Sequence, residues 1–341
     1  MIGNPALSII ATAVADDFNG FDRREALDAM IKTATQPRQH APDWAQIDTK
    51  MLDRYGYLPF DLKPNESVST TVEMGIGDDA VARVAKAVGD RATETFFAQR
   101  ARNYAHLFDP QTRLMRGRDS TGNWRPDFDP VTPTSPLSNP GDYTEGNAWQ
   151  YSLAPALHDP QGLVALIGGE AMFGHWLDQF FSLNTLKTNP FLGQEAIIGQ
   201  YAHGNEPSHH IAWLYAYTPT PWHGHARLRE IHRRFYSDKP DGVIGNDDAG
   251  QMSAWYVLAT LGFYPVVPAS GEFVIGAPEV RSARLLLGNG KRLQIRAPHF
   301  DESHPWARVV RWNGAVLQAK SINYGNLTAG GELAFEMHPM P

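Results

Sequence analysis

The chain contains no cysteine in its 341 residues. This absence excludes disulfide bonds, thiolate nucleophiles and zinc sites with cysteine ligands. It does not indicate the compartment, because exported proteins can also lack cysteine.

Clusters of positive charge are also missing. The net charge is −7, the pI is near 6.0, and no basic cluster is longer than Arg233-Arg234. Nucleic acid is therefore not an expected partner. No apolar run approaches the roughly 18 residues that a membrane-spanning helix needs, so we expect no membrane span.

The amino terminus lacks the features of a signal peptide. Residues 1–10 have neither a basic start nor a small-residue cleavage site. They have the composition of a helix that is entered abruptly, so we expect the chain to begin inside a larger protein.

Aromatic residues, in contrast, are abundant, with 9 Trp, 12 Tyr and 16 Phe. Flat rings stack on the apolar faces of pyranoses, so this content suits sugar binding, although large cores also use aromatic residues. A hydrophobic content of 42% is enough for one large core or two domains.

Helical patterns dominate residues 5–261, and short alternating segments typical of strands follow Gly262. Helix pairs joined by loops rich in Gly, Pro and polar residues indicate an α/α toroid or part of one. We therefore predict a mainly α protein with a toroid over residues 1–264 and a small antiparallel β-domain over residues 265–341. The predicted helices are 6–16, 23–33, 67–88, 92–106, 148–153, 161–167, 169–181, 208–217, 226–236 and 251–261, and the predicted strands are 273–275, 282–287, 292–297, 308–312 and 333–337.

Two adjacent carboxylates, Asp247 and Asp248, lie between Gly245 and Gly250, directly before the predicted helix 251–261. Adjacent like charges repel, and a chain places them together mainly at solvated turns, helix N-termini or cation sites. The glycines allow the backbone to approach a ligand closely. Taken alone, the segment fits an exposed loop that favours the start of a helix; two further carboxylate motifs upstream make a functional site an open alternative.

The first of these motifs contains Glu145, at the end of a proline-rich segment over residues 109–144 that we predict to be a long loop. A helix bearing Trp149 follows, and we expect Thr144 to be its N-cap with Glu145 in the first turn. One interpretation is a glutamate that favours the helix dipole. The other is a general acid whose protonated form is favoured by apolar neighbours such as Trp149.

The second motif contains Asn205 and Glu206, which precede Pro207 as at an ordinary helix start. An amide oxygen, a carboxylate and backbone carbonyls on an irregular loop are also the hard donors that Ca²⁺ prefers. Zinc is not expected, because the adjacent His209 and His210 point apart on a helix and no third nitrogen ligand has suitable spacing.

Together these segments resemble glycoside hydrolase family 92, the calcium-dependent α-mannosidases. The similarity extends over essentially the whole chain, and the matching blocks occur in the family's order. These blocks are residues 56–59, 66–69, 108–110, 145–151, 162–169, 203–210, 245–255 and 261–265.

The resemblance implies an exo-acting, inverting α-mannosidase that removes terminal α-linked mannose from glycans, as in N-glycan degradation. It also implies an (α/α)₆ toroid followed by a β-sandwich-like domain, Ca²⁺ as cofactor, and a periplasmic or extracellular location. The implied catalytic residues are Glu145 as acid and Asp248 as base, with Asp247 as a second candidate. The implied metal ligands are Asn205, Glu206 and Asp248, and the implied substrate-binding residues are Trp149, His203 and Asn147.

The chain departs from the family pattern in ways that keep alternatives open. The family's amino-terminal β-sandwich and first toroid helices lie outside this chain, and Ala80 stands where Trp commonly follows the Asp78-Asp79 pair. One alternative is a catalytically silent fragment that binds mannan. Another is a different toroid glycosidase or a lyase, although a lyase needs cationic residues near these motifs and none are clustered there.

Overall fold

The structure is a computed structural model that describes residues 3–37, 49–184 and 197–341. By the density of their contacts these residues form two compact units. Unit 1 comprises residues 3–37, 49–167, 183–184 and 268–270, and unit 2 comprises residues 168–182, 197–267 and 271–341. The predicted boundary at residues 264 and 265 divides the chain by type of secondary structure and stays a prediction.

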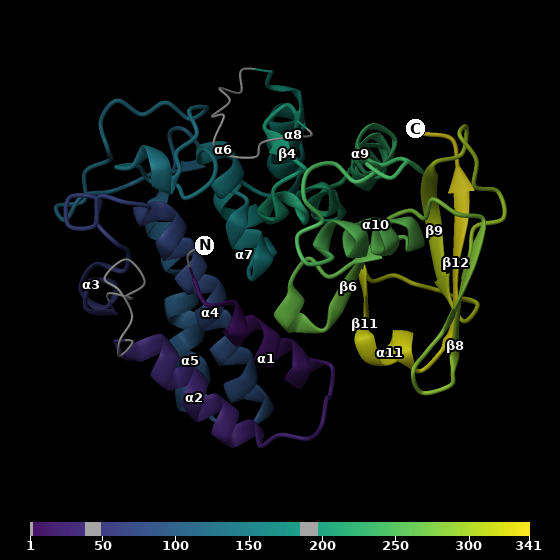
Figure 1. Ribbon diagram of the computed structural model, residues 1–341, viewed down its shortest axis with the longest axis horizontal. Coiled ribbons are helices and arrows are strands. Elements are labelled where there is room, and N and C mark those ends of the chain that lie inside the picture. The colour runs from purple at the N-terminus through teal and green to yellow at the C-terminus, as the bar shows by residue number, and fades with distance from the viewer. Residues whose placement is uncertain (1–2, 38–48, 185–196) are drawn as a thin grey trace. The chain divides into compact units, whose positions relative to one another are not determined.

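Unit 1 is built around the long helix α4, with α1, α2 and α5 packed against it (Figure 1). Two glycines of α4 permit close approach: a Cβ added at Gly77 would lie 3.0 Å from Leu7, and one added at Gly75 would lie 2.9 Å from the carbonyl oxygen of Ala101. The elements of unit 1 are α1 (Pro5–Ala15), α2 (Arg23–Thr35), α3 (Thr49–Tyr55), α4 (Ser67–Ala87), α5 (Arg91–Arg100), η2 (Ala101–Leu107), β1 (Phe108–Asp109), β2 (Leu114–Met115), η3 (Pro136–Ser138), α6 (Ala148–Tyr151), η4 (Ala154–Leu157), α7 (Pro160–Ile167) and η7 (Pro268–Ser270).

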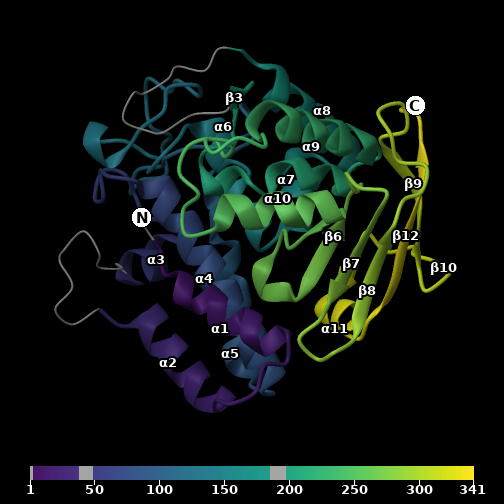
Figure 2. The same cartoon turned by 45° about the vertical axis from the view of Figure 1, so that its right-hand side comes forward.

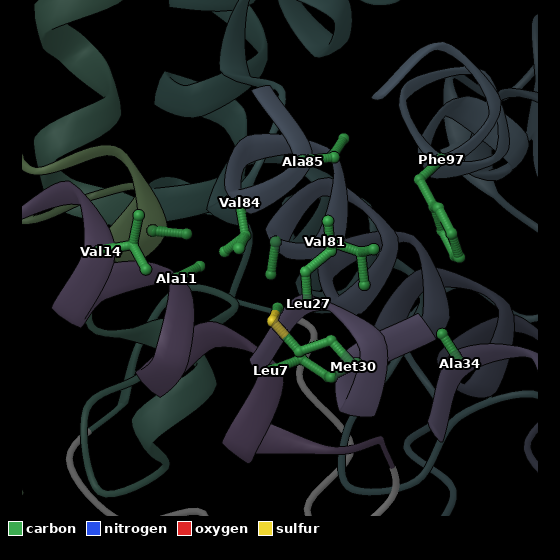
Figure 3. Close-up of a cluster of buried hydrophobic side chains, with 13 residues drawn as sticks. Leu7, Ala11, Val14, Leu27, Met30, Ala34, Val81, Val84, Ala85 and Phe97 are labelled. Atoms are coloured by element: carbon green, nitrogen blue, oxygen red, sulfur yellow. The ribbon is translucent and has the colours of Figure 1, made fainter. Parts of the chain in front are cut away.

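A buried apolar cluster joins these four helices (Figure 3). Leu7 from α1, Met30 from α2, Val81 from α4 and Phe97 from α5 are each at most 6% exposed. Removing such side chains from water is the main stabilising term for a helical layer of this kind. The cluster therefore fixes α4, whose amino-terminal end carries the loop that contains Glu145.

Among its described residues, unit 2 combines helices with three sheets, the smallest of which pairs β3 with β4. The five-stranded sheet has the order β10-β9-β12-β8-β7, and the three-stranded sheet has the order β11-β6-β5. Figure 2 shows α11 beside β8 of the larger sheet. The elements of unit 2 are α8 (Glu170–Ser182), β3 (Ile197–Ile198), β4 (Tyr201–Ala202), η5 (Glu206–Ser208), η6 (Ile211–Tyr217), α9 (Pro221–Phe235), α10 (Gln251–Leu261), β5 (Phe263–Tyr264), β6 (Glu272–Ile275), β7 (Ser282–Leu286), β8 (Arg292–Arg296), β9 (Trp306–Trp312), β10 (Ala315–Val316), β11 (Ser321–Asn323), α11 (Tyr324–Thr328) and β12 (Gly331–His338).

Most predicted elements are confirmed with ends shifted by a few residues, and the chain is mainly α with small sheets. Two of the predicted helices contain 3₁₀ helix instead of α-helix, at Ala101–Leu107 and Ile211–Tyr217. The prediction of a purely antiparallel β-domain is wrong at one pair, since β12 lies parallel to β8 while pairing antiparallel with β9. Within the described ranges, no helix is both long and apolar enough to cross a membrane.

Candidate active site

The loop that carries Glu145 is docked on the amino-terminal end of α4. The carbonyl oxygen of Asp142 accepts hydrogen bonds from the backbone N–H groups of Val68 and Ser69, at 3.1 and 3.2 Å. The Ser69 hydroxyl in turn accepts from the Thr144 N–H at 2.9 Å. Free N–H groups at a helix start need such acceptors, so the helix end and the loop fix each other.

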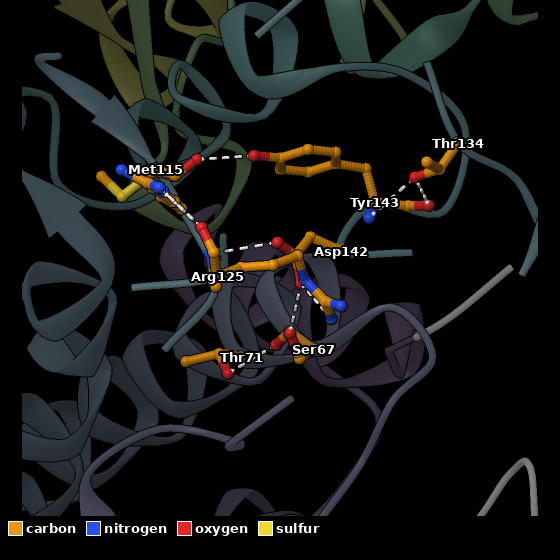
Figure 4. A network of polar contacts seen from close by, with 9 residues as sticks. Ser67, Thr71, Met115, Arg125, Thr134, Asp142 and Tyr143 are labelled. Carbon is orange, nitrogen blue, oxygen red and sulfur yellow. Dashed lines mark hydrogen bonds and ion pairs between the residues drawn. The ribbon is translucent and has the colours of Figure 1, made fainter. Parts of the chain in front are cut away.

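The buried carboxylate of Asp142 clamps the same loop to three other segments (Figure 4). Its Oδ1 accepts from the Ser67 hydroxyl at 3.0 Å and from Arg125 Nε at 2.9 Å, and its Oδ2 accepts from the Gly117 N–H at 3.1 Å. The Arg125 guanidinium also lies 4.1 Å from the ring centroid of Phe60. The negative charge of Asp142 is therefore fully compensated although it lies inside the protein.

Tyr143 and Thr134 provide a second clamp on the other side of the loop (Figure 4). The Tyr143 hydroxyl donates to the carbonyl oxygen of Met115 at 2.7 Å. The Thr134 hydroxyl donates to the Tyr143 carbonyl at 2.7 Å and accepts from the Tyr143 N–H at 3.0 Å. The backbones of Thr134 and Gly146 exchange two further bonds. Glu145, which is partly exposed, thus lies in a short segment that is held on both sides.

The helix after Glu145 begins later than predicted. Its N-cap is Asn147, whose Oδ1 accepts from the Gln150 N–H at 3.1 Å, while Gln150 Oε1 accepts from the Asn147 N–H at 3.0 Å. The prediction of Thr144 as N-cap is wrong, because Thr144 is bonded to α4 instead. Glu145 therefore lies ahead of the helix rather than in its first turn, so the helix dipole does not explain its presence.

Two of the predicted substrate-binding residues lie at this helix. Asn147 is fully buried and forms a reciprocal capping box with Gln150, and its contact with substrate stays a prediction. Trp149 is partly exposed one residue into α6, and its contact with substrate stays a prediction.

The Asp142→Ala substitution is expected to destabilise the protein by about 2–5 kcal/mol, because the Gly117 N–H and the Ser67 hydroxyl lose their buried acceptor and the partly buried Arg125 loses its ion pair. The loss should appear as a lower midpoint in urea unfolding of the whole chain. The matched control is Asp61→Ala: Asp61 accepts two bonds from Ser120, at 2.8 and 2.6 Å, but is exposed. Its loss should cost about 0.5–1.5 kcal/mol per bond at most. Equal costs for the two variants would contradict the clamp.

The second motif lies in unit 2, where His203 is completely buried. Its Nδ1 is 2.7 Å from the Tyr201 hydroxyl and its Nε2 is 2.7 Å from the Tyr236 hydroxyl. Because Tyr236 donates its own proton to the Met252 carbonyl at 3.1 Å, His203 Nε2–H must be the donor to Tyr236 and Nδ1 the acceptor from Tyr201. Burial lowers the pKa of His203 to about 2, so the ring is neutral.

His209 provides a second connection between this motif and the acidic segment. Its Nε2 donates to the His203 carbonyl and its Nδ1 accepts from the Gln251 amide, both at 3.0 Å. Trp255 Nε1 donates to the His209 carbonyl at 2.9 Å. Residues 203–210 and residues 251–255 are therefore brought together in one unit, as a shared site requires.

This arrangement determines which metal the segment could hold. Both ring nitrogens of His203 and both of His209 are used in hydrogen bonds, so neither is a nitrogen ligand for zinc. Asn205 is buried at the N-cap of η5, but its side chain makes no capping bond there, and Glu206 beside it is partly exposed. The donors that fit an ion are hard oxygens, which suit Ca²⁺. Across the described residues no three Asp, Glu or His side chains form a ready cage, so amide and carbonyl oxygens would have to complete the coordination.

The two aspartates of the acidic segment have different surroundings. Asp247 Oδ1 accepts from both the N–H and the hydroxyl of Ser253, each at 2.9 Å, and so caps the start of α10. Asp247 therefore fits the interpretation of a helix-start carboxylate. Asp248 is exposed, and among the described residues its carboxylate has no hydrogen-bond partner.

The backbone beside Asp248 is held in an uncommon conformation. Asp248, Ala249 and Gly250 have φ values of 48°, 57° and 94°. Successive left-handed residues other than glycine are strained and persist where the surroundings impose them, often at functional sites. Here the cap between Asp247 and Ser253 on one side and α10 on the other impose a turn that presents the Asp248 carboxylate to solvent.

The structure therefore joins two of the three predicted motifs. Asn205, Glu206 and Asp248 lie in segments that are connected inside unit 2, whereas Glu145 lies in unit 1, and its meeting with them stays a prediction. The ring of His203 is buried and lies against the rings of Tyr201 and Tyr236, and its contact with substrate stays a prediction. Sequence reasoning missed Tyr201, Tyr236 and Ser253, since no spacing rule connects them to the motifs.

Comparison with known proteins identifies the family of this chain. The model of the glycosyl hydrolase family 92 catalytic domain matches residues 1–339. A family GH92 α-mannosidase from Bacteroides thetaiotaomicron in complex with mannoimidazole superposes with a TM-score of 0.90 and 36% identity, over 99% of this chain and 43% of that chain. A family GH92 inverting mannosidase from Bacteroides thetaiotaomicron VPI-5482 gives a TM-score of 0.86 and 31% identity, over 99% of this chain and 46% of that one.

A curated relative extends the comparison to fungi. An uncharacterized secreted glycosidase of Arthroderma benhamiae is 26% identical over 360 residues, which cover 97% of this chain and 44% of the relative. The chain thus spans less than half the length of the proteins it matches. Since the family model covers nearly all of its residues, this chain belongs to glycosyl hydrolase family 92.

Proposed function

We propose that this chain is the catalytic part of an exo-acting, inverting α-mannosidase that removes terminal α-linked mannose from glycans with the assistance of Ca²⁺. The observation that carries the proposal is the junction of the 203–210 loop with the start of α10, which joins the segment of Asn205 and Glu206 to the segment that presents the exposed Asp248 carboxylate. The two Bacteroides structures are described as mannosidases, one of them as inverting.

In the proposed reaction Glu145 protonates the glycosidic oxygen as the bond to the anomeric carbon breaks. Asp248 takes a proton from a water molecule that attacks the same carbon from the opposite face. Inversion of this kind needs two carboxyl groups about 6.5–9.5 Å apart, so that the water fits between base and sugar.

Asn205 and Glu206 would hold Ca²⁺, with Asp248 touching the ion or its water. When bound, the ion would engage mannose hydroxyls and favour distortion of the ring toward the transition state. The buried His203 and the partly exposed Tyr236 position the loop, because their hydrogen bonds connect the His203 side chain to the Met252 carbonyl of α10. Asp247 positions Asp248 by capping α10.

The wider setting is part of the same proposal. The helices of the chain would belong to an (α/α)₆ toroid that the longer relatives complete with an amino-terminal part. Since one relative is described as a secreted glycosidase, we propose that the protein acts in the periplasm or outside the cell. Its substrates would be mannose-containing oligosaccharides or the glycans of glycoproteins.

The test is mannose release from an α-linked mannobiose by the purified chain, followed by NMR. We expect release of β-mannose first, because inversion reverses the anomeric configuration. EDTA should abolish release and added Ca²⁺ should restore it, whereas Mg²⁺ should restore little, since it demands a smaller and more regular site. Activity that is unchanged by EDTA would contradict the metal assignment. Sugar binding without hydrolysis would instead favour the silent mannan-binding fragment.

A further inference from the structure

A cavity of about 410 Å³ lies in unit 2 beside the acidic segment. One side is formed by the chain that follows α9 and the other by the exposed face of α10. The lining includes Tyr236, Ser237, Asp238, Ser253 and Tyr256. Its size falls within the range of small-molecule sites, and none of the substrate-binding residues named above lines it.

Two tyrosine rings form the apolar wall of the cavity. The ring centroids of Tyr236 and Tyr256 are 4.8 Å apart with planes tilted by 36°. Tyr236 is fixed by its hydroxyl bonds to His203 and Met252, and its ring stacks on the buried Trp255 at 6.1 Å and 10°. Tyr256 is 40% exposed. A rigid aromatic corner of this kind suits the apolar face of a sugar ring.

The opposite wall is a closed turn. The Ser237 N–H donates to the Gly242 carbonyl, and the Gly242 N–H donates to the Lys239 carbonyl, both at 2.9 Å. A Cβ at Gly242 would collide with the Ser237 carbonyl oxygen, so only glycine allows this close approach. The turn therefore fixes the backbone that carries Ser237 and Asp238, two residues of the cavity lining.

The charge of the cavity selects against anionic ligands. Its lining contains the Asp238 carboxylate and no Lys, Arg or His. Ser253, also in the lining, donates its hydroxyl to Asp247 at 2.9 Å, which places a second carboxylate next to the cavity. A phosphorylated or uronic sugar would be repelled by these charges, whereas the hydroxyls of a neutral sugar could donate to them.

We propose that this cavity is an accessory subsite for a neutral hexopyranose of the same glycan, separate from the residue whose bond is broken. Ser253 connects the two places, because it lines the cavity and anchors Asp247 beside the proposed base. Glycans with several sugars would then bind more tightly than single mannosides. This inference rests on the proposed function for the identity of the sugar.

The test compares the Tyr256→Ala variant with the unchanged chain. In an inactive Glu145→Gln background, the Kd for a linear α-mannotetraose, measured by calorimetry, should rise about tenfold, which corresponds to about 1.4 kcal/mol. With Glu145 intact, kcat/KM for 4-nitrophenyl α-mannoside should stay the same, because this substrate is too short to reach the cavity. Phe96→Ala is the matched control, since Phe96 is an exposed aromatic residue on α5 in the other unit, and it should change neither value.

A second variant tests the argument from charge. Asp238→Lys should weaken mannotetraose binding and allow measurable binding of mannose 6-phosphate, which the unchanged cavity should reject. An unaltered Kd for mannotetraose in Tyr256→Ala would overturn the subsite, as would equal Kd values for mannotetraose and methyl α-mannoside in the unchanged chain. Binding does not require hydrolysis, so a chain that binds through Tyr256 but releases no mannose would contradict the proposed function alone.

Discussion

The Asp248→Asn substitution is expected to lower kcat for α-mannoside hydrolysis by about 10²–10⁴-fold, the usual contribution of a general base. An amide keeps the size of the side chain but does not accept a proton near neutral pH. Asp248 has this role because its carboxylate is exposed and, within the described chain, is not used to stabilise any helix. The measurement is steady-state kinetics with 4-nitrophenyl α-mannoside.

The neighbouring Asp247→Asn substitution should cost much less activity. The amide oxygen of asparagine can still accept from the Ser253 N–H, as a helix cap requires. Azide should also restore turnover in Asp248→Ala, because this small anionic nucleophile needs no base, and it should not change the Asp247 variant. A larger loss in the Asp247 variant than in the Asp248 variant would reverse the assignment of the two residues.

Helix α10 shows which parts of the fold were predictable. The prediction of residues 251–261 matches it at both ends. The signals are local, since the apolar run is bounded by Gly250 and Gly262, which have φ values of 94° and 90°. Glycine adopts these left-handed conformations without steric strain, so both ends of α10 can be predicted from the local sequence alone.

The start of α4 shows the opposite case. Ser67 and Ser69 look like N-caps, yet the N-cap is Glu66 without a capping side chain, and the acceptors come from Asp142 about 75 residues later in the chain. The two serines instead bond outward, Ser67 to the Asp142 carboxylate and Ser69 to Thr144. Because the partner is so distant in the sequence, the local pattern does not predict these hydrogen bonds.

The prediction of the site was likewise limited to what local sequence shows. The residue types of the three motifs indicated carboxylate chemistry. Which of Asp247 and Asp248 is free to act as the base could not be predicted, because it depends on the hydrogen bond from Ser253 to Asp247, which forms only in the folded helix. His203 was expected to touch sugar because of the family resemblance. Its ring is enclosed by Tyr201 and by Tyr236, which is 33 residues away in the sequence.

The Glu145→Gln substitution is expected to remove most activity on natural glycosides while sparing activated ones. For an α-mannobiose, kcat should fall by about 10²–10⁴-fold, because the leaving sugar alkoxide needs a proton. For 2,4-dinitrophenyl α-mannoside the loss should be less than about tenfold, since this phenolate leaves without protonation. The ratio of the two losses, measured in parallel at one pH, reports the acid role directly.

Position in the fold makes this substitution informative. Glu145 does not cap a helix, and its loop is held by Asp142, Tyr143 and Thr134 through bonds that the glutamine leaves intact. The unfolding midpoint should therefore fall less than it does in Asp142→Ala, while kcat falls. Glu94, in the first turn of α5, is the control: Glu94→Gln should alter neither rate. Equal losses on both mannosides in Glu145→Gln would mean that Glu145 binds substrate without donating a proton, and the acid would have to be sought on another element.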